Sequence, residues 1–429
     1  MKKSIGMIGL AAAGALPAPA FAQALVLPDS GDTAWLLTAS VLALMTILPG
    51  LALLHAGRGT ARHALSAFLQ CFAIAAAVSL LFAVIGYSLA FGPGTALIGG
   101  GGNLFLSNLG DVREGLLVPE SAFALFQMML AIVAPVLLAG ATAGRARLPW
   151  VIGMALVWSL IVYAPIAHWL WGGGWLAGLG AVDFGGGLVI HASAGVSALV
   201  LVKLLGPRTG WGSTPLPAHA RALMLTGAGL AWLGFFGLAG GWAMSATDDA
   251  ATALINTHLG ACAAGLGWML AERLRTGRIS ASGFALGALT GIAAVASSAV
   301  YVAPLGAIAT GLIAAVLAFF AARILRRWLR ADDPLHLFAV HGIGGIAGAL
   351  LLAAFVFPAL GGPGLEGGGT VVTLLVGQGV AVVTVAAWSV IGTLIAALGL
   401  AMVLPMRVTP AEEAERDASA HQERAWEWE

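Results

Sequence analysis

The sequence predicts an all-α polytopic membrane protein with eleven transmembrane helices. Hydrophobic residues make up 60% of the 429 positions and charged residues only 9%, whereas a soluble domain carries roughly 25% charged residues. The apolar runs are continuous and about long enough to cross a hydrocarbon core of roughly 30 Å. They do not alternate as the strands of a membrane barrel do. This composition excludes a disordered chain and an ordinary soluble enzyme, and a net charge of +1 gives no basic surface for nucleic acid.

Residues 1–22 predict a cleaved signal peptide. A short basic start, Lys2-Lys3, precedes an apolar stretch over residues 5–16, and Ala20-Phe21-Ala22 has the A-x-A form of a cleavage site. The alternative is a short first span, but two prolines interrupt the stretch and it is too short to cross the bilayer. We therefore expect a mature chain that starts near Gln23 outside the cytoplasm, with the membrane domain over residues 23–404.

The apolar runs after the signal define the expected spans. Full helices satisfy all their backbone N–H and C=O groups internally, which the lipid environment requires. An odd number of spans places the two termini on opposite sides of the membrane. The expected helices cover residues 33–54, 64–91, 119–142, 148–170, 185–205, 220–243, 250–271, 280–298, 304–325, 335–357 and 372–404.

The basic residues fix the expected orientation. Eighteen Lys and Arg residues follow the signal, and 17 of them fall in alternate loops, at the helix ends beside those loops, or after the last span. Only Arg113 falls on the other side. Because basic residues are concentrated in cytoplasmic loops, the pattern predicts an outside N-terminus and a cytoplasmic C-terminus in the inner (plasma) membrane.

Two histidine segments repeat in opposite orientation. Asp183 precedes His191 by eight residues, Asp333 precedes His341 by eight, and each histidine has a glycine four positions later. The first of these helices enters from outside and the second from the cytoplasm. Helices 1–5 therefore map onto helices 6–10 as an inverted repeat, with helix 11 packing outside. A rise of 1.5 Å per residue puts both imidazoles roughly 12 Å into the bilayer, close to its midplane.

The paired histidines are the main candidate site. Ionisable residues in the bilayer core are costly and mark transport routes, although a lone histidine can also be satisfied by a backbone carbonyl. A two-histidine metal site is the chemical alternative, but no third ligand is at hand. Cys71 and Cys262 lie in apolar runs and are interpreted as small buried hydrophobic residues. We expect no metal and no cofactor.

The motifs around these histidines resemble the ammonium transporter (Amt/Mep/Rh) family over nearly the whole chain. They are Trp171-Gly-Gly-Gly-Trp175, Asp183-Phe-Gly-Gly-Gly with His191, and Asp332-Asp333-Pro334 with His341-Gly342. The resemblance implies a homotrimer of eleven-helix protomers, each with its own narrow hydrophobic pore for ammonium or ammonia. It further implies that His191 and His341 line the pore, that Asp183 organises the outer vestibule, and that Trp171 walls the cation recruitment site.

Two stretches depart from the family pattern. Phe126-Gln127-Met128-Met129-Leu130 and Phe236-Gly237-Leu238-Ala239-Gly240-Gly241-Trp242 place Leu130 and Leu238 where the family has two gate phenylalanines. Trp242 replaces the serine of the recruitment site, whereas Phe126 matches the family pattern. The leucines are either neutral replacements in a hydrophobic plug or a gate with different leakage. Trp242 is either an interfacial anchor or a second π surface that faces Trp171.

Residues 405–429 predict a cytoplasmic regulatory tail. The composition becomes charged after Pro405, which is also typical of a disordered solubilising end. The resemblance implies a PII-type signalling protein as a cytoplasmic partner, and the tail keeps the family's Asp-x-Ser-x-His core at Asp417, Ser419 and His421.

Three functions remain open from the sequence. The first is ammonium/ammonia transport through the twin-histidine pore, with cation recruitment outside and passage after deprotonation. The second is an ammonium sensor or regulatory homologue with weak or absent conduction, which the altered gate suggests. The third, an intramembrane histidine-dependent enzyme, is disfavoured because no nucleophile or complete metal set is visible, so we expect that the protein is not an enzyme.

Overall fold

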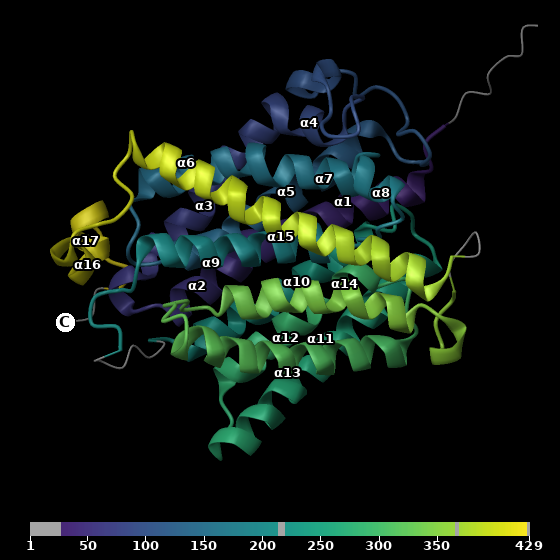
Figure 1. The fold of residues 1–429 in the computed structure, drawn as a ribbon. Coiled ribbons are helices and arrows are strands. Elements are labelled where there is room, and N and C mark those ends of the chain that lie inside the picture. Colours follow the sequence, from purple (N-terminus) through teal and green to yellow (C-terminus); the bar gives the residue numbers. More distant parts are fainter. Residues whose placement is uncertain (1–26, 213–218, 365–368, 427–429) are drawn as a thin grey trace, which may run out of the picture.

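The computed structural model describes residues 27–212, 219–364 and 369–426 and shows an all-helical bundle (Figure 1). Eleven described helical segments are long and apolar enough to cross a membrane, which confirms the predicted number and order of spans. The predicted signal peptide lies outside the described residues.

The eleven spans are built from continuous and interrupted helices. The first five spans are, in chain order, α1 Ser30–Met45 with η1 Thr46–Leu51 and α2 Ala52–Arg58; α3 Ala64–Leu81 with η3 Phe82–Gly86 and α4 Tyr87–Phe91; α5 Glu120–Thr142; α6 Leu148–Trp158 with η5 Ser159–Tyr163, α7 Ala164–Trp171 and α8 Trp175–Gly178; and η6 Gly187–Ala192 with α9 Ser193–Leu205. Spans six to ten are α10 Arg221–Gly241; α11 Asp248–Thr276; α12 Ala281–Val295 with η7 Ala296–Ser298; α13 Pro304–Arg327; and η8 Phe338–Ile343 with α14 Gly344–Phe355. The eleventh span is α15 Val371–Ala401.

Several helices extend beyond the apolar runs that predicted them. The first span continues to Arg58 rather than residue 54, and α11 continues to Thr276 rather than residue 271. A hydropathy run ends where polar residues begin, but backbone hydrogen bonding continues through those residues into the aqueous layer. Gly277, with φ +74°, then ends α11 in the left-handed region that favours glycine.

The two halves of the chain interlock around the histidine segments. The fifth span contacts the tenth reciprocally, with α9 against η8 and α14 against η6. The first helices of the two halves, α1 and α10, also pack together. This reciprocal packing agrees with the predicted inverted repeat.

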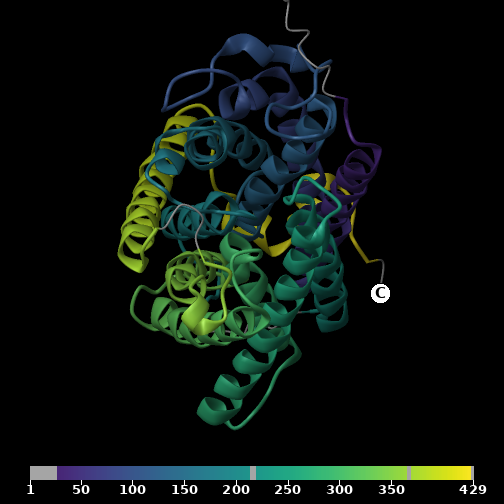
Figure 2. The ribbon, with the colours of Figure 1, turned by 90° about the vertical axis from the view of Figure 1, so that its right-hand side faces the viewer.

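Helix α15 lies on the outside of the bundle, as predicted. It runs across one face in Figure 1, and in Figure 2 it lies along one side of the molecule. It packs mainly on α9, α14 and α6, and also on η5, η6 and α8, so it contacts both halves of the repeat. Two short tail helices, α16 Pro410–Ala414 and α17 Arg416–His421, lie at one end of the bundle (Figure 1).

Candidate functional site

The two predicted histidines meet in the interior of the bundle. The Nδ1 atoms of His191 and His341 are 3.0 Å apart, and the rings are nearly parallel, with centroids 5.0 Å apart and 8° between planes. Both side chains are buried. The spacing argument thus predicted correctly that residues 150 positions apart reach the same depth from opposite directions.

The hydrogen bond between the rings restricts their protonation. If both imidazoles are neutral, one Nδ1 carries the proton and the other accepts it. The donor ring then has a free acceptor at Nε2, while the other ring has an N–H there. Nε2 of His191 is buried and has no hydrogen-bond partner among the described residues. An unpaired buried polar atom is costly, so this nitrogen is the feature of the pair best suited to meet a small polar molecule.

Glycines at equivalent positions allow the two histidine segments to approach. A Cβ on Gly195 would lie 2.1 Å from the backbone nitrogen of Gly342. A Cβ on Gly345 would lie 2.2 Å from the carbonyl oxygen of Gly187. Each glycine follows its histidine by four residues and packs on the backbone of the opposite half. Close backbone contact of this kind explains why small residues are needed there.

Both histidines lie in π-helical turns. His191 N–H donates to Gly186 O, five residues earlier, at 3.0 Å, and His341 lies in the corresponding turn η8. Such turns are often found at functional sites. Sequence periodicity could not distinguish this local widening from an ordinary α-helix, so this feature was missed.

Asp183 links the outer aromatic residues to the histidine turn. Its Oδ2 accepts hydrogen bonds from the N–H groups of Leu188 (3.0 Å) and Val189 (2.8 Å), and its Oδ1 accepts from Ser297 Oγ (2.6 Å). Its backbone oxygen accepts from Trp171 Nε1 at 2.6 Å. Burial raises the Asp183 pKa to about 6, although the hydrogen bond from Ser297 and those from the backbone oppose this shift. The carboxylate therefore caps the turn that carries the histidine and does not face open solvent.

The outer residues form an aromatic cluster. Trp242 packs against Trp171 with ring centroids 4.1 Å apart and 39° between planes, and its centroid lies 6.2 Å from that of Phe126. Trp242 follows the end of α10, at its C-cap. Of the two alternatives for Trp242, the structure has the indole facing Trp171, where it covers part of that residue's surface.

The leucines at the predicted gate positions are both buried, Leu130 on α5 and Leu238 on α10. Sequence reasoning missed two neighbours of the site and one buried polar side chain. Phe235 lies 5.4 Å from the His191 ring by centroids, and Ser297 donates to Asp183. The buried Gln127 amide has no partner among the described residues. The only indication of Gln127 in the sequence was its position directly after Phe126 in the Phe-Gln motif.

The Asp333 end of the repeat contains a buried ionic cluster. Asp332 accepts hydrogen bonds from Arg145 Nη1 (3.1 Å) and from Arg208 Nε (2.8 Å) and Nη2 (2.7 Å). Burial disfavours the Asp332 carboxylate, but hydrogen bonds and charge from Arg208, followed by the charge of Arg145, hold its pKa below the ordinary value. Asp333 Oδ2 accepts from Phe338 N–H at 3.1 Å, as Asp183 does at the start of the other histidine turn.

The tail is docked on the loops at this end. Asp417 accepts hydrogen bonds from the N–H groups of Leu65 and Ser66, both at 2.9 Å, and from Ser66 Oγ at 2.7 Å. It therefore caps the start of α3 from outside that helix. Glu413 accepts from Thr209 N–H at 2.8 Å. The described part of the tail thus contacts the bundle through these hydrogen bonds.

Comparison with known proteins now decides the family. The model of the Ammonium Transporter Family matches residues 34–426. The chain belongs to the ammonium transporter family. It is 37% identical over 403 residues to an ammonium transporter of Aquifex aeolicus, covering 93% of this chain and 94% of that protein.

Solved structures of ammonium transporter family relatives share the fold. Candida albicans Mep2 aligns with a TM-score of 0.82 at 32% identity, over 90% of this chain and 88% of that one. A structure described as a Sensor Amt Protein aligns with a TM-score of 0.84 at 29% identity, over 90% and 96%. Membership in a family of transporters confirms the prediction that the protein is not an enzyme and removes the third function left open by the sequence.

Proposed function

We propose that this protein carries ammonium or ammonia across the membrane along a pathway that passes His191 and His341. The observation that supports the proposal best is the buried imidazole pair with the unpartnered Nε2 of His191. A structural histidine pair would satisfy its nitrogens internally, whereas a transport site needs one that is free for the substrate.

In the proposed mechanism, the outer aromatic cluster recruits the cation. Indole faces attract a cation by roughly 0.5–2 kcal/mol, and Trp171 and Trp242 both offer such faces. Asp183 adds negative potential and holds Trp171 through its backbone oxygen. Ammonium resembles potassium in size, so selection depends on π faces, directional hydrogen bonds and the ability to lose a proton.

The buried region beyond the cluster favours the neutral species. Leu130 and Leu238 are both buried, and an uncompensated charge is far more costly to bury than a neutral amine. We therefore propose that ammonium releases its proton, to water on the outer side or to the nearer imidazole, and passes the histidines as ammonia. The imidazole with the free Nε2 then accepts a hydrogen bond from ammonia, and the other donates its Nε2–H to the ammonia nitrogen. The His191–His341 hydrogen bond offers a route for a proton.

Uptake of ammonium or methylammonium into proteoliposomes tests this proposal. Wild-type protein should give uptake above that of empty liposomes, and current recording in the same bilayer would show whether charge moves with the substrate. Uptake equal to that of empty liposomes would contradict the transport function.

A specific observation favours a second candidate, an ammonium sensor with weak or absent conduction. Trp242 packs on Trp171 at 4.1 Å, where the family has a small serine, and the chain is similar to a Sensor Amt Protein. In this candidate, ammonium binding at the aromatic cluster is retained while flux is slow. Ammonium-dependent changes in tryptophan fluorescence without uptake would favour the sensor.

The remaining features of the proposal concern assembly and topology. We propose a homotrimer in the plasma membrane, with a cleaved signal over residues 1–22, an outside N-terminus and a cytoplasmic tail over residues 405–429. The gathering of Arg62, Arg147 and Arg407 around acidic tail residues supports a common side for these loops. We further propose that the docked tail transmits binding of a PII-type partner to the pore.

A further inference from the structure

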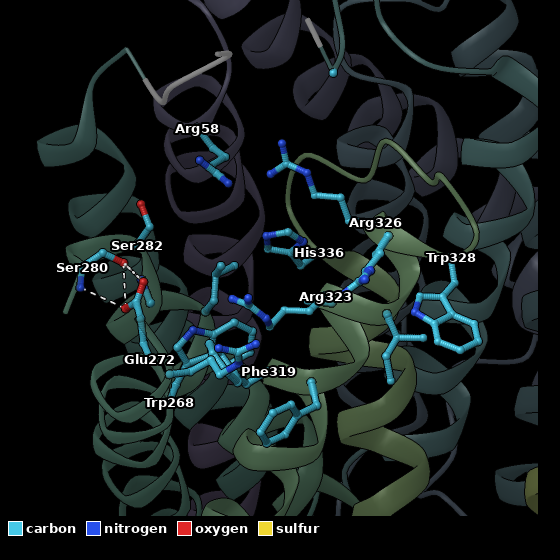
Figure 3. Close-up of a pocket in the computed structure, with 18 of the residues that line it drawn as sticks. Arg58, Trp268, Glu272, Ser280, Ser282, Phe319, Arg323, Arg326, Trp328 and His336 are labelled. Atoms are coloured by element: carbon cyan, nitrogen blue, oxygen red, sulfur yellow. Dashed lines mark hydrogen bonds between the residues drawn. The ribbon is translucent and has the colours of Figure 1, made fainter. Parts of the chain in front are cut away.

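A third buried histidine lies close to the His191–His341 pair. His55 is in α2 and is 3% exposed, and it is near enough to His341 for the two side chains to interact electrostatically. Arg58 ends α2 about one helical turn later and lines the arginine-rich cavity shown in Figure 3. His55 therefore lies between the histidine pair and the basic end of the bundle.

One nitrogen of the His55 ring is left without a partner. Its Nε2 atom is buried and has no hydrogen-bond partner among the described residues. Its Nδ1 atom lies 3.6 Å from the sulfur of Cys71, a buried free thiol on α3. A buried polar atom without a hydrogen bond is costly, and an apolar side chain of similar size would avoid that cost. Packing alone therefore does not account for an imidazole at this position.

The space beside this nitrogen is kept open by a glycine of α5. A Cβ on Gly140 would lie 3.2 Å from His55 Nε2. The same Cβ would lie 2.3 Å from Leu335 Cδ1 and 3.2 Å from Leu337 Cδ1, so the nitrogen and both leucines surround one point. Leu337 precedes His341 by four residues, about one helical turn. This point is therefore about one turn from the pair, toward the basic end.

We propose that His55 is a third hydrogen-bonding station for ammonia, one turn from the pair on the side of the basic end. The inference rests on the transport function proposed above and adds a residue to its pathway. The Cys71 thiol donates to Nδ1, so Nε2 carries the ring proton and donates a hydrogen bond to the lone pair of ammonia. Leu335 and Leu337 offer no competing side-chain acceptor. Ammonium has donors but no acceptor, so an N–H at this point selects the neutral species, and no proton is transferred.

Ammonium uptake into proteoliposomes by matched variants tests the station. His55→Leu removes the N–H and should lower uptake about two- to tenfold, as expected for the loss of one hydrogen bond. His55→Gln keeps an N–H near the position of Nε2 and should stay within about twofold of the wild type. The control is His258→Leu, which removes an exposed histidine of α11 and should leave uptake unchanged. A residue that only fills space would not distinguish glutamine from leucine in this way.

Nitrogen-15 NMR of histidine-labelled protein in bilayers separates this inference from the transport function. The His55 signal is identified by its absence from His55→Gln. Ammonium chloride at alkaline pH, where part of it is ammonia, should shift this signal in the wild type, and potassium chloride should not.

The two measurements together decide between the possible outcomes. A shifted His55 signal in a wild type without uptake would contradict the transport function but support ammonia binding at His55. Uptake by the wild type, with an unshifted signal and with His55→Leu equal to His55→Gln, would overturn the His55 inference and leave the transport function standing.

Discussion

The packing of Trp242 on Trp171 gives the sharpest prediction about recruitment. Trp242→Ala removes one indole from the cluster and exposes the Trp171 face that it covers at 4.1 Å. Trp242→Ser does the same but supplies the hydroxyl typical of the family. If the two indoles share the cation, the alanine variant loses a π contact worth roughly 0.5–2 kcal/mol.

The expected sizes follow from these energies. Trp242→Ala should weaken the apparent ammonium affinity by about two- to thirtyfold. A hydroxyl hydrogen bond contributes about 1 kcal/mol, so Trp242→Ser should bind more tightly than the alanine variant. Trp242→Ser combined with Leu238→Phe should stay within roughly tenfold of the wild type, because about 1.4 kcal/mol corresponds to that factor.

Concentration-dependent uptake in proteoliposomes measures these affinities. The control is Trp328→Phe, because Trp328 is an exposed tryptophan at the C-cap of α13, far from Trp242 in the sequence. Equal affinities for the wild type and Trp242→Ala would refute the shared-cation reasoning. If the double variant transports and the wild type does not, the natural protein is a non-conducting homologue and the sensor function leads.

Three further predictions concern Asp183, Asp332 and Asp417. Asp183→Asn should keep its three side-chain hydrogen bonds, because the Ser297 hydroxyl can accept instead of donate, but should lower uptake about tenfold through loss of charge. Wild-type uptake should also fall as pH falls through about 6, the pKa that burial gives Asp183, and the asparagine variant should lack this dependence. The Asp183 pKa is raised above its usual 3.8 in the folded protein, so protonation of Asp183 below pH 6 stabilises the fold. Unfolding caused by protonation of Asp183 therefore cannot explain the lost uptake. Asp332→Ala leaves Arg145 buried without its ion-pair partner and should destabilise the protein by about 3–5 kcal/mol in thermal unfolding. Because the Asp332 pKa is lowered in the folded protein, the stabilisation that the wild-type carboxylate provides should persist above pH 4 and disappear only in stronger acid. Asp417→Ala should release the tail and increase its proteolysis. Truncation after Pro410 should alter ammonium flux or the binding of a PII-type partner; unchanged flux and unchanged binding in the truncated protein would make the tail a passive docked end.

The sequence predicted the eleven spans, the outer position of α15 and the common depth of the two histidines. These features depend on hydropathy, helix rise and an internal repeat, all of which are local or periodic properties. The positions of helix ends were less accurate, as for α11, because hydrogen bonding continues past the apolar run.

Other features depend on packing between distant segments and could not be predicted from the sequence. Ser297 lies 114 residues from the Asp183 that it contacts, and no periodic pattern connects them. The docking of Asp417 on the start of α3 likewise joins residues 351 positions apart. The contact between Trp171 and Trp242 was one of two alternatives because hydropathy cannot assign an indole to lipid or to a neighbouring ring.

Ammonium uptake by His191→Ala and His341→Ala tests the central claim most directly. Each substitution removes one side of the 3.0 Å hydrogen bond and leaves a single imidazole in this part of the pathway, while the bundle keeps its helix contacts. The account predicts normal expression of both variants with altered flux or altered selectivity between ammonium and potassium. Unchanged flux and unchanged selectivity in both variants would contradict it.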